Sequence, residues 1–203
     1  MDDINKFFDK PLNLKGMNIA VVGSSYCLIN KSNGKLIDSH DHVVRFNLAP
    51  INGYEKHVGF REDFRVINNG QYYLWERTRE IHNSKIIFQN PRNITYGADR
   101  DRYLHKSSTV YISDPKQVPL LKKKLDFKSS RIPSSGIYFV MMCVDSGIVP
   151  TLFGFDFENI PYQHYWEKES IPSGDATDIP YEKTFLTKLL AEGKIKTGNY
   201  ENL

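Results

Sequence analysis

The chain has 203 residues, of which 40% are hydrophobic and 25% are charged, and its formal net charge is +3. These values are typical of soluble globular proteins and argue against disorder, collagen-like repeats and coiled coils. No run of about 18 apolar residues occurs, so a transmembrane helix is not expected, and the polar first residues do not resemble a secretory signal.

Hydrophobic runs and turn residues divide the chain into alternating strands and helices. In chain order the sequence predicts strands at 18–23, 42–47 and 64–68, a helix at 71–82, strands at 85–88 and 109–112, helices at 115–125 and 135–146, a strand at 149–155 and a closing helix at 181–192. This alternation predicts a single α/β domain over residues 1–203, with a mostly parallel central sheet and helices on both faces.

Two long irregular segments, 90–108 and 157–178, each follow a predicted strand. Open α/β sheets bind ligands beyond the carboxyl ends of their strands. Long loops in a compact domain are also often lids or binding segments. We therefore expect both segments to contribute to a binding site.

The turn after the first strand contains Gly23, Ser24 and Ser25. A glycine and two hydroxyl groups at this place allow backbone amides and side chains to approach a phosphate. Neither GxGxxG nor GxxxxGKS occurs there. A plain strand-to-helix turn is an equally good interpretation of these residues.

A second candidate site precedes the apolar helix at 135–146, where Ser134, Ser135 and Gly136 follow a proline. Serine is a favoured N-cap, because its side-chain oxygen accepts a hydrogen bond from an unpaired amide of the first turn. The same helix end attracts anions. Capping and anion binding are both consistent with this sequence.

Two other groups of residues suggest chemistry. His164 lies in the long loop after the last predicted strand, where a histidine that gains a proton near neutral pH can stabilise a departing phosphate; the alternative is an incidental surface histidine. Asp99 and Asp101 have the DxD spacing of carboxylates that hold Mg²⁺ or Mn²⁺ in many nucleotide-sugar transferases, although this pattern is common by chance.

Taken together, these segments resemble the motifs of the sialyltransferases of glycosyltransferase family 29. The long sialylmotif corresponds to AVVGSS at 20–25, GKLIDSHDHVVRFNLAP at 34–50 and GYEKHVGFR at 53–61. The short motif corresponds to PSSGI at 133–137, with LFGF at 152–155 downstream, and the third motif to HYWE at 164–167. The matches follow the family's order from about residue 18 to residue 192.

The resemblance implies a Rossmann-like variant of the GT-A fold and an inverting, metal-independent transfer of sialic acid from CMP-sialic acid to a sugar hydroxyl. The alternative donor is a related CMP-activated nonulosonic or ulosonic acid. The implied partners are this CMP-sugar donor and a glycan or glycolipid acceptor, without any cofactor. His164 would stabilise the departing phosphate, and the residues implied in donor binding are Gly23, Ser24, Ser25, Asn47, Ser134, Ser135, Gly136, Gly154 and Phe155.

The chain departs from the family at the last motif, His-x-x-x-x-Glu, whose histidine is the family's general base. Glu182 matches the glutamate, which puts Thr177 at the position of the histidine. A threonine hydroxyl accepts protons poorly at neutral pH, so we expect Asp178, or else Asp175, to act as the base. The alternative is that both aspartates cap loops.

The two cysteines, Cys27 and Cys143, form no zinc-binding motif and are too few to staple a domain of this size. The positions of the family's disulfide are Ile19 and Gly147 here, so that disulfide is not expected. Together with the missing secretory signal, the cysteine count predicts a reducing compartment and a cytoplasmic protein. The lysine run at 122–124 is typical of a solvated helix face, so no nucleic-acid partner is expected.

Three functions are compatible with these observations. The first is a small sialyltransferase or a transferase of a related CMP-activated acid. The second is a CMP or CMP-sugar binding protein that lost catalysis together with the base histidine. The third is a metal-dependent nucleotide-sugar transferase that uses Asp99 and Asp101.

Overall fold

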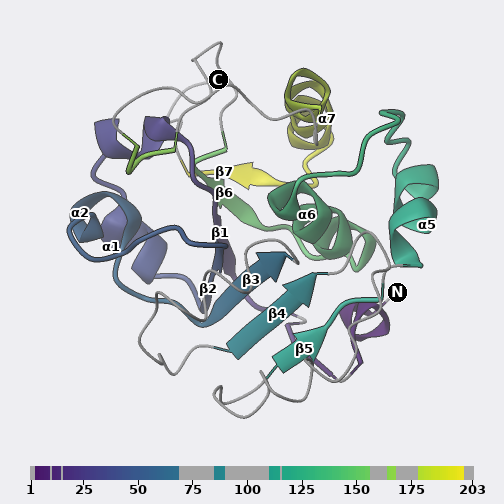
Figure 1. Cartoon of the computed structure of the whole chain (residues 1–203), viewed down its shortest axis with the longest axis horizontal. Helices are drawn as coiled ribbons and strands as arrows, with labels where there is room; N and C mark the ends of the chain where they lie inside the picture. Colours follow the sequence, from purple (N-terminus) through teal and green to yellow (C-terminus); the bar gives the residue numbers. More distant parts are fainter. Residues whose placement is uncertain are drawn as a thin grey trace.

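A parallel sheet crosses the molecule (Figure 1). The computed structural model describes residues 3–9, 11–14, 16–68, 85–89, 110–114, 116–155, 164–167 and 178–198. In this part of the chain seven strands lie in the order β5-β4-β3-β2-β1-β6-β7, and each neighbouring pair is parallel. The strands are β1 (Ile19–Val22), β2 (His42–Phe46), β3 (Phe64–Asn68), β4 (Lys85–Gln89), β5 (Val110–Ile112), β6 (Thr151–Phe153) and β7 (Lys196–Thr197).

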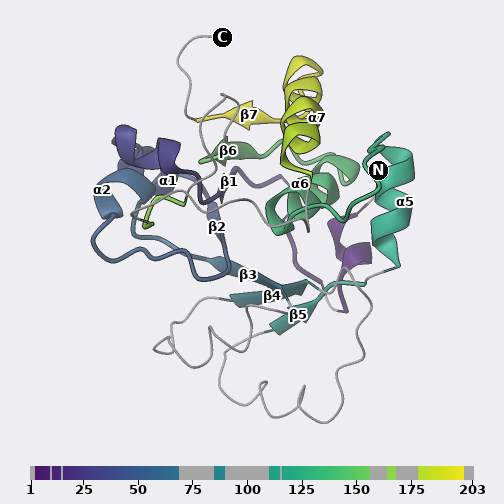
Figure 2. The same cartoon turned by 45° about the horizontal axis from the view of Figure 1, so that its top comes forward.

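Helices cover both faces of this sheet. The α-helices are α1 (Gly34–Asp38), α2 (Glu55–Val58), α5 (Gln117–Lys124), α6 (Ser135–Asp145) and α7 (Ile179–Ala191), and two 3-10 helices are η1 (Ile4–Phe7) and η2 (Tyr26–Asn30). Figures 1 and 2 show α5, α6 and α7 on one side of the strands and α1 and α2 on the other. No helix among the described residues is long and apolar enough to cross a membrane.

The central strand β1 explains why the sheet is covered twice. Its four residues are all buried, and successive side chains of a strand point to opposite faces. Ile19 and Val21 belong to the apolar cluster that contains α6 and part of α7. Ala20 and Val22 belong to a second cluster with residues of α1, α2 and η2. A continuous apolar strand therefore needs helices on both sides.

The predicted α/β fold with a mostly parallel sheet is confirmed, and the predicted elements within the described residues are present within two residues at each end. The predicted helix at 71–82 and the loop at 90–108 lie outside the described residues, as does most of the loop at 157–178. The sequence did not predict η1, η2, α1, α2 or β7, because a helix of four or five residues makes little more than one turn and β7 has only two residues.

The N-terminal residues are an integral part of the core. Ile4 and Phe7 of η1 are buried, and Phe8 forms an isolated antiparallel bridge with Ser113. The buried carboxylate of Asp145, at the end of α6, pairs with the ammonium groups of Lys6 and Lys124, each at 2.6 Å. These two ion pairs join η1 and α5 to the end of α6.

Candidate functional site

A cavity of about 320 Å³ lies at the carboxyl ends of β1, β2, β3 and β6, next to the N-terminus of α6. The chain leaves β1 toward β2 on one side and returns as β6 on the other, so the cavity is at the topological switch point where open α/β sheets bind ligands. Ten of the eleven residues predicted for the site line this cavity, and they are Gly23, Ser24, Ser25, Asn47, Ser134, Ser135, Gly136, Gly154, Phe155 and His164.

Two glycines bring the turns after β1 and β6 into close contact at the bottom of the cavity. The amide of Gly23 donates to the carbonyl of Phe153 at 2.7 Å, and the amide of Ser25 donates to that of Gly154 at 3.1 Å. A Cβ atom at Gly23 would lie 2.5 Å from the carbonyl oxygen of Gly154. Gly154 itself has a φ of +67°, which favours glycine. Larger residues would push the two turns apart.

The start of α6 combines capping with an exposed helix end. Ser134 is the N-cap, and its Oγ accepts the amide of Ile137 at 3.4 Å. The amide of Ser134 donates to the buried carboxylate of Glu182 at 2.6 Å. Because that amide is already paired, an anion in the cavity would meet the following amides, those of Ser135 and Gly136. Both sequence interpretations of this serine pair are therefore compatible with the geometry.

Asn47 lies in a backbone conformation that few residues adopt, with a φ of +46°. Its side-chain oxygen accepts the amide of Asn68 at 3.2 Å, which joins the ends of β2 and β3. The buried Arg65 donates to the carbonyl oxygens of residues 46, 47 and 49 at 2.9–3.2 Å and pairs with the buried carboxylate of Glu62. The turn that carries Asn47 is thus held from below by one guanidinium group.

His164 reaches the cavity from the segment 164–167. The backbone of His164 forms an isolated bridge with Ser25, and the amide of Tyr165 donates to the carbonyl of Ser24 at 3.0 Å. The ring Nδ1 lies 2.7 Å from a carboxylate oxygen of Glu167. The third motif, at 164–167, is therefore attached to the turn after β1, and that turn is part of the long sialylmotif.

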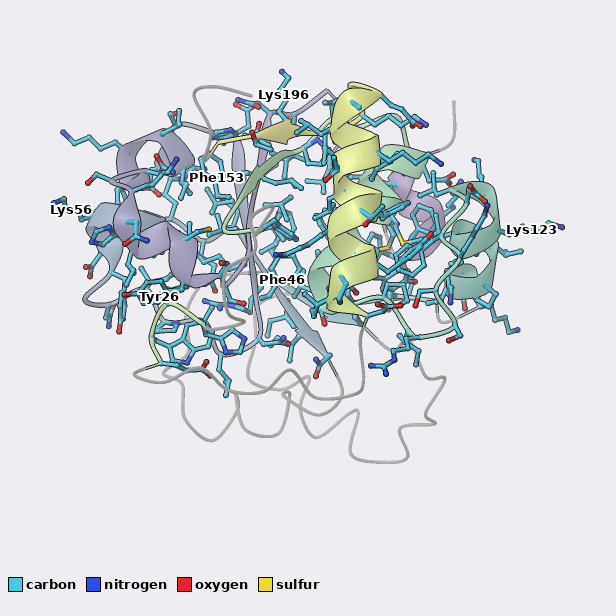
Figure 3. The ribbon with its side chains drawn as sticks, turned by 90° about the horizontal axis from the view of Figure 1, so that it is seen from above. Tyr26, Phe46, Lys56, Lys123, Phe153 and Lys196 are labelled. Atoms are coloured by element: carbon cyan, nitrogen blue, oxygen red, sulfur yellow. The ribbon has the colours of Figure 1, made fainter. Side chains whose placement is uncertain are left out.

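The face of α7 that lines the cavity was largely missed by the sequence analysis. It presents Ile179, Glu182, Lys183 and Leu186, which follow the spacing of one helix face. The other lining residues not predicted are Phe46, Asn68 and Ile137. Figure 3 shows Phe46 beside α7 in the view from above. Asn68 had a usable signal, because it ends a predicted strand next to the one that carries Asn47.

Glu182 is an unusual carboxylate, because it is buried at 5% exposure and pairs with a neutral amide rather than a cation. Burial raises its pKa to about 7, against hydrogen bonds from Ser134 that lower it, and the nearby Asp178 adds to the rise. The proton is therefore held near neutral pH in the folded protein but released near pH 4.5 in the unfolded chain.

Replacing Glu182 with glutamine is expected to stabilise the protein at pH 8 by about 1–3 kcal/mol. The folded carboxylate has the higher pKa, so the free energy of unfolding of the wild type falls as the pH rises from about 4.5 to about 7. Glutamine has no proton to lose and still accepts the Ser134 amide. Urea unfolding at several pH values measures this; an identical pH dependence in both proteins would contradict it.

Asp178, the proposed base, lies at the N-cap of α7 and is not among the residues that line the cavity. One carboxylate oxygen accepts the amide of Tyr181 at 3.3 Å, and the other accepts the hydroxyl of Ser129 at 2.8 Å. Thr177 and Asp175 lie outside the described residues. The capping role expected as the alternative is present, and a role for Asp178 as base stays a prediction.

The described residues contain no group of three or more His, Cys, Asp and Glu side chains placed to hold a metal ion. Asp99 and Asp101 lie outside them, so the DxD hypothesis is not addressed by the structure.

Comparison with known sequences places the resemblance in the first half of the chain. Residues 6–90 match the model of glycosyltransferase family 29 (sialyltransferase). The bovine β-galactoside α-2,6-sialyltransferase 2 is 54% identical over 50 residues, which are 25% of this chain and 10% of that protein. The sialyltransferase-like protein 2 of Arabidopsis thaliana is 38% identical over 66 residues, 32% of this chain and 15% of that protein. The matched segment is thus a small part of these relatives.

These relatives overturn one expectation from the sequence. The predicted cytoplasmic location is wrong, because the homologous sialyltransferases are enzymes of the Golgi lumen. The prediction depended on the absence of a signal sequence and on the cysteine count. Cys27 and Cys143 are buried free thiols, but a protein of an oxidising compartment does not need a disulfide. Neither observation fixes a compartment.

Comparison with solved structures extends the similarity to nearly the whole chain. A mammalian sialyltransferase matches with a TM-score of 0.71 and 22% identity over 97% of this chain and 76% of that chain. The α-2,3-sialyltransferase Cst-I of Campylobacter jejuni matches with a TM-score of 0.59 and 16% identity over 93% of this chain and 78% of that chain. The fold is therefore that of sialyltransferases. Together, the sequence match over residues 6–90 and this fold confirm the resemblance of the chain to glycosyltransferase family 29.

Proposed function

We propose that residues 1–203 form a single sialyltransferase-like domain, a variant of the GT-A fold. It transfers sialic acid, or a related CMP-activated nonulosonic or ulosonic acid, from the CMP donor to a hydroxyl group of a glycan or glycolipid. The transfer inverts the anomeric centre and uses neither a metal ion nor another cofactor. The observation that carries this proposal is the convergence of three motifs, from 20–61, 133–155 and 164–167, on one cavity.

The cavity suggests how the donor is divided among these motifs. Asn47 and Ser24 contact the CMP portion, and Ser135 and Gly136 hold the phosphate and ribose at the helix end next to the N-cap Ser134. Gly154 and Phe155 flank the cytidine ring. This role for Phe155 is supported by its packing, because a Cβ atom at Gly136 would lie only 2.9 Å from the ring of Phe155. Gly23 and Ser25 complete the turn beneath the donor.

In the proposed reaction the bond between the anomeric carbon and the phosphate oxygen breaks, and its electron pair leaves with CMP. The acceptor hydroxyl attacks from the opposite face and forms the glycosidic bond, and its proton passes to a base. The N-terminus of α6 and His164 meet the negative charge that grows on the phosphate. Glu182 is poorly placed to be the base, because it binds the amide of Ser134 on the leaving-group side.

The test is release of CMP from CMP-sialic acid in the presence of a panel of galactosides. Turnover that is unchanged by EDTA supports the proposal as stated. Turnover that EDTA abolishes favours a metal-dependent transferase with Asp99 and Asp101 instead. Absence of CMP release with every CMP-activated acid and every acceptor rejects the transferase function.

A second candidate function is favoured by the position of Asp178. Both of its carboxylate oxygens accept hydrogen bonds within the protein, and the family's base histidine is replaced by Thr177. A protein without a base would bind CMP or a CMP-sugar with little or no transfer. Calorimetry that detects CMP binding without turnover, and turnover gained in the Thr177→His variant, would support this function.

The Asp178→Asn variant separates the two functions. If Asp178 accepts the proton of the acceptor, we expect kcat to fall by about 10²–10⁴-fold. Asparagine is as good an N-cap as aspartate, so the stability of α7 should be preserved. Steady-state CMP release and a thermal unfolding curve measure both effects. Wild-type kcat in this variant would show that Asp178 only caps the helix.

A further inference from the structure

The ring of His164 has to be oriented by something other than its backbone. The contacts of the segment 164–167 with Ser24 and Ser25 fix the main chain of His164 beside the cavity. The neighbouring Tyr165 is buried, and its hydroxyl donates to the carbonyl of Pro50. These backbone contacts fix the position of the Cα atom of His164, but they do not determine which ring nitrogen faces the donor.

The carboxylate of Glu167 contacts both the ring and the backbone of His164. Its Oε1 lies 2.7 Å from Nδ1 of the ring, and its Oε2 accepts the backbone amide at 3.0 Å. Partial burial acts to raise the pKa of Glu167, but the hydrogen bonds from His164 outweigh it and lower that pKa. An ionised carboxylate only accepts hydrogen bonds, so Nδ1 carries a proton. A hydrogen bond from this ring to a ligand must then use Nε2.

Trp166 adds a second restraint on the ring. The two rings are stacked, with centroids 4.5 Å apart and planes inclined by 2°. Stacking on the indole fixes the plane of the imidazole, so the ring is held by Trp166 as well as by Glu167. Other described charged groups near the site are Glu182 and Lys183, which line the same cavity from α7.

We propose that Glu167 is a positioning residue that holds His164 with Nδ1 protonated and Nε2 directed at the phosphate of the donor. The proposal rests on the proposed function, in which His164 meets the departing phosphate. The phosphate gains negative charge only as the bond to the sugar breaks. A misoriented His164 ring therefore weakens the stabilisation of the transition state more than it weakens the binding of the donor. The loss therefore appears in kcat and much less in the affinity for CMP.

The test is a double-mutant cycle with Glu167→Gln and His164→Ala. We expect Glu167→Gln alone to lower kcat by about 10–100-fold and to change the Kd for CMP, measured by calorimetry, by less than about threefold. In the His164→Ala background it should cost less than about twofold more, because there is no ring left to orient. The matched control is Glu192→Gln, which changes an exposed carboxylate at the C-cap of α7. Additive losses, or wild-type kcat in Glu167→Gln, would overturn the proposal.

A readout independent of turnover keeps this proposal separate from the proposed function. Long-range ¹⁵N–¹H spectra at about pH 9, where an ordinary imidazole is neutral, report which nitrogen of His164 bears the proton. We expect Nδ1–H in the wild type and a shift toward Nε2–H in Glu167→Gln, because glutamine can turn its own N–H toward the ring. If Glu167→Gln shows this change of tautomer but the wild type transfers no sugar, the proposed function is rejected and the positioning of His164 by Glu167 stands. Turnover without the shift overturns the positioning role.

Discussion

Replacing His164 with alanine is expected to lower kcat by about 10²–10³-fold, the usual cost of removing one preorganised group that stabilises developing charge. The phosphate gains negative charge as the glycosidic bond of the donor breaks, and His164 lies in the cavity where that phosphate is proposed to bind. The side chain is 26% exposed, and its ring stacks on Trp166 at the edge of the second apolar cluster, so we expect a small loss of stability and a preserved fold. Steady-state CMP release and urea unfolding measure the two effects.

The control for this variant is His57→Ala. His57 lies on α2 and is not among the residues that line the cavity, and its ring Nδ1 is 2.7 Å from the carbonyl of Lys31. Its loss should leave kcat unchanged. A His164→Ala protein that unfolds at the wild-type urea concentration and turns over at the wild-type rate would remove this histidine from the mechanism.

Replacing Arg65 with methionine is expected to cost about 3–5 kcal/mol in free energy of unfolding. The guanidinium group is 3% exposed, pairs with the equally buried carboxylate of Glu62, and donates to three carbonyl oxygens of the turn after β2. Methionine has similar length but no donors. The variant therefore removes the guanidinium group from one buried carboxylate and from three carbonyl groups. Urea or thermal unfolding measures the loss.

Two further variants test whether the loss in Arg65→Met comes from the buried charge. The Glu62→Gln change in the Arg65→Met background should recover part of the stability, because it removes the buried charge that Arg65 no longer neutralises. Lys194→Met breaks an exposed ion pair with Glu192 and should cost less than about 1 kcal/mol. Since Arg65 also holds the backbone of Asn47, the affinity for CMP should fall at temperatures where Arg65→Met is still folded. A loss below 1 kcal/mol in Arg65→Met would contradict the assigned burial cost.

The sheet could be predicted because its strands are short apolar runs with clear ends. The run at 19–22 is apolar on both faces, which indicates a central parallel strand, and Gly23 ends it. Helices α1 and α2 could not be predicted in this way, because they have only five and four residues. Their positions depend on tertiary contact, since any side chain at Gly34 would overlap the carbonyl oxygen of Glu55.

The site was predictable to the extent that it consists of strand ends. The carboxyl ends of parallel strands share one edge, so Gly23, Asn47 and Gly154 had to lie together. The contribution of α7 was not predictable, because the sequence does not specify which face of a helix turns toward a cavity. The cap was visible in the sequence, where Asp178 is followed by a proline at the second helix position.

The pairing of β1 with β6 also bears on how the protein folds. These neighbouring strands are far apart in the sequence, with Ala20 in register with Thr151. When two such distant strands pair, the chain loses loop-closure entropy before the stabilising contacts between them form. The pairing of β1 with β6 is therefore expected to be slow. The strands β1, β2 and β3 follow one another along the chain and can assemble earlier. The floor of the cavity, where Gly23 meets Gly154, is therefore completed late, and the ability to bind a nucleotide is acquired only when refolding is nearly finished.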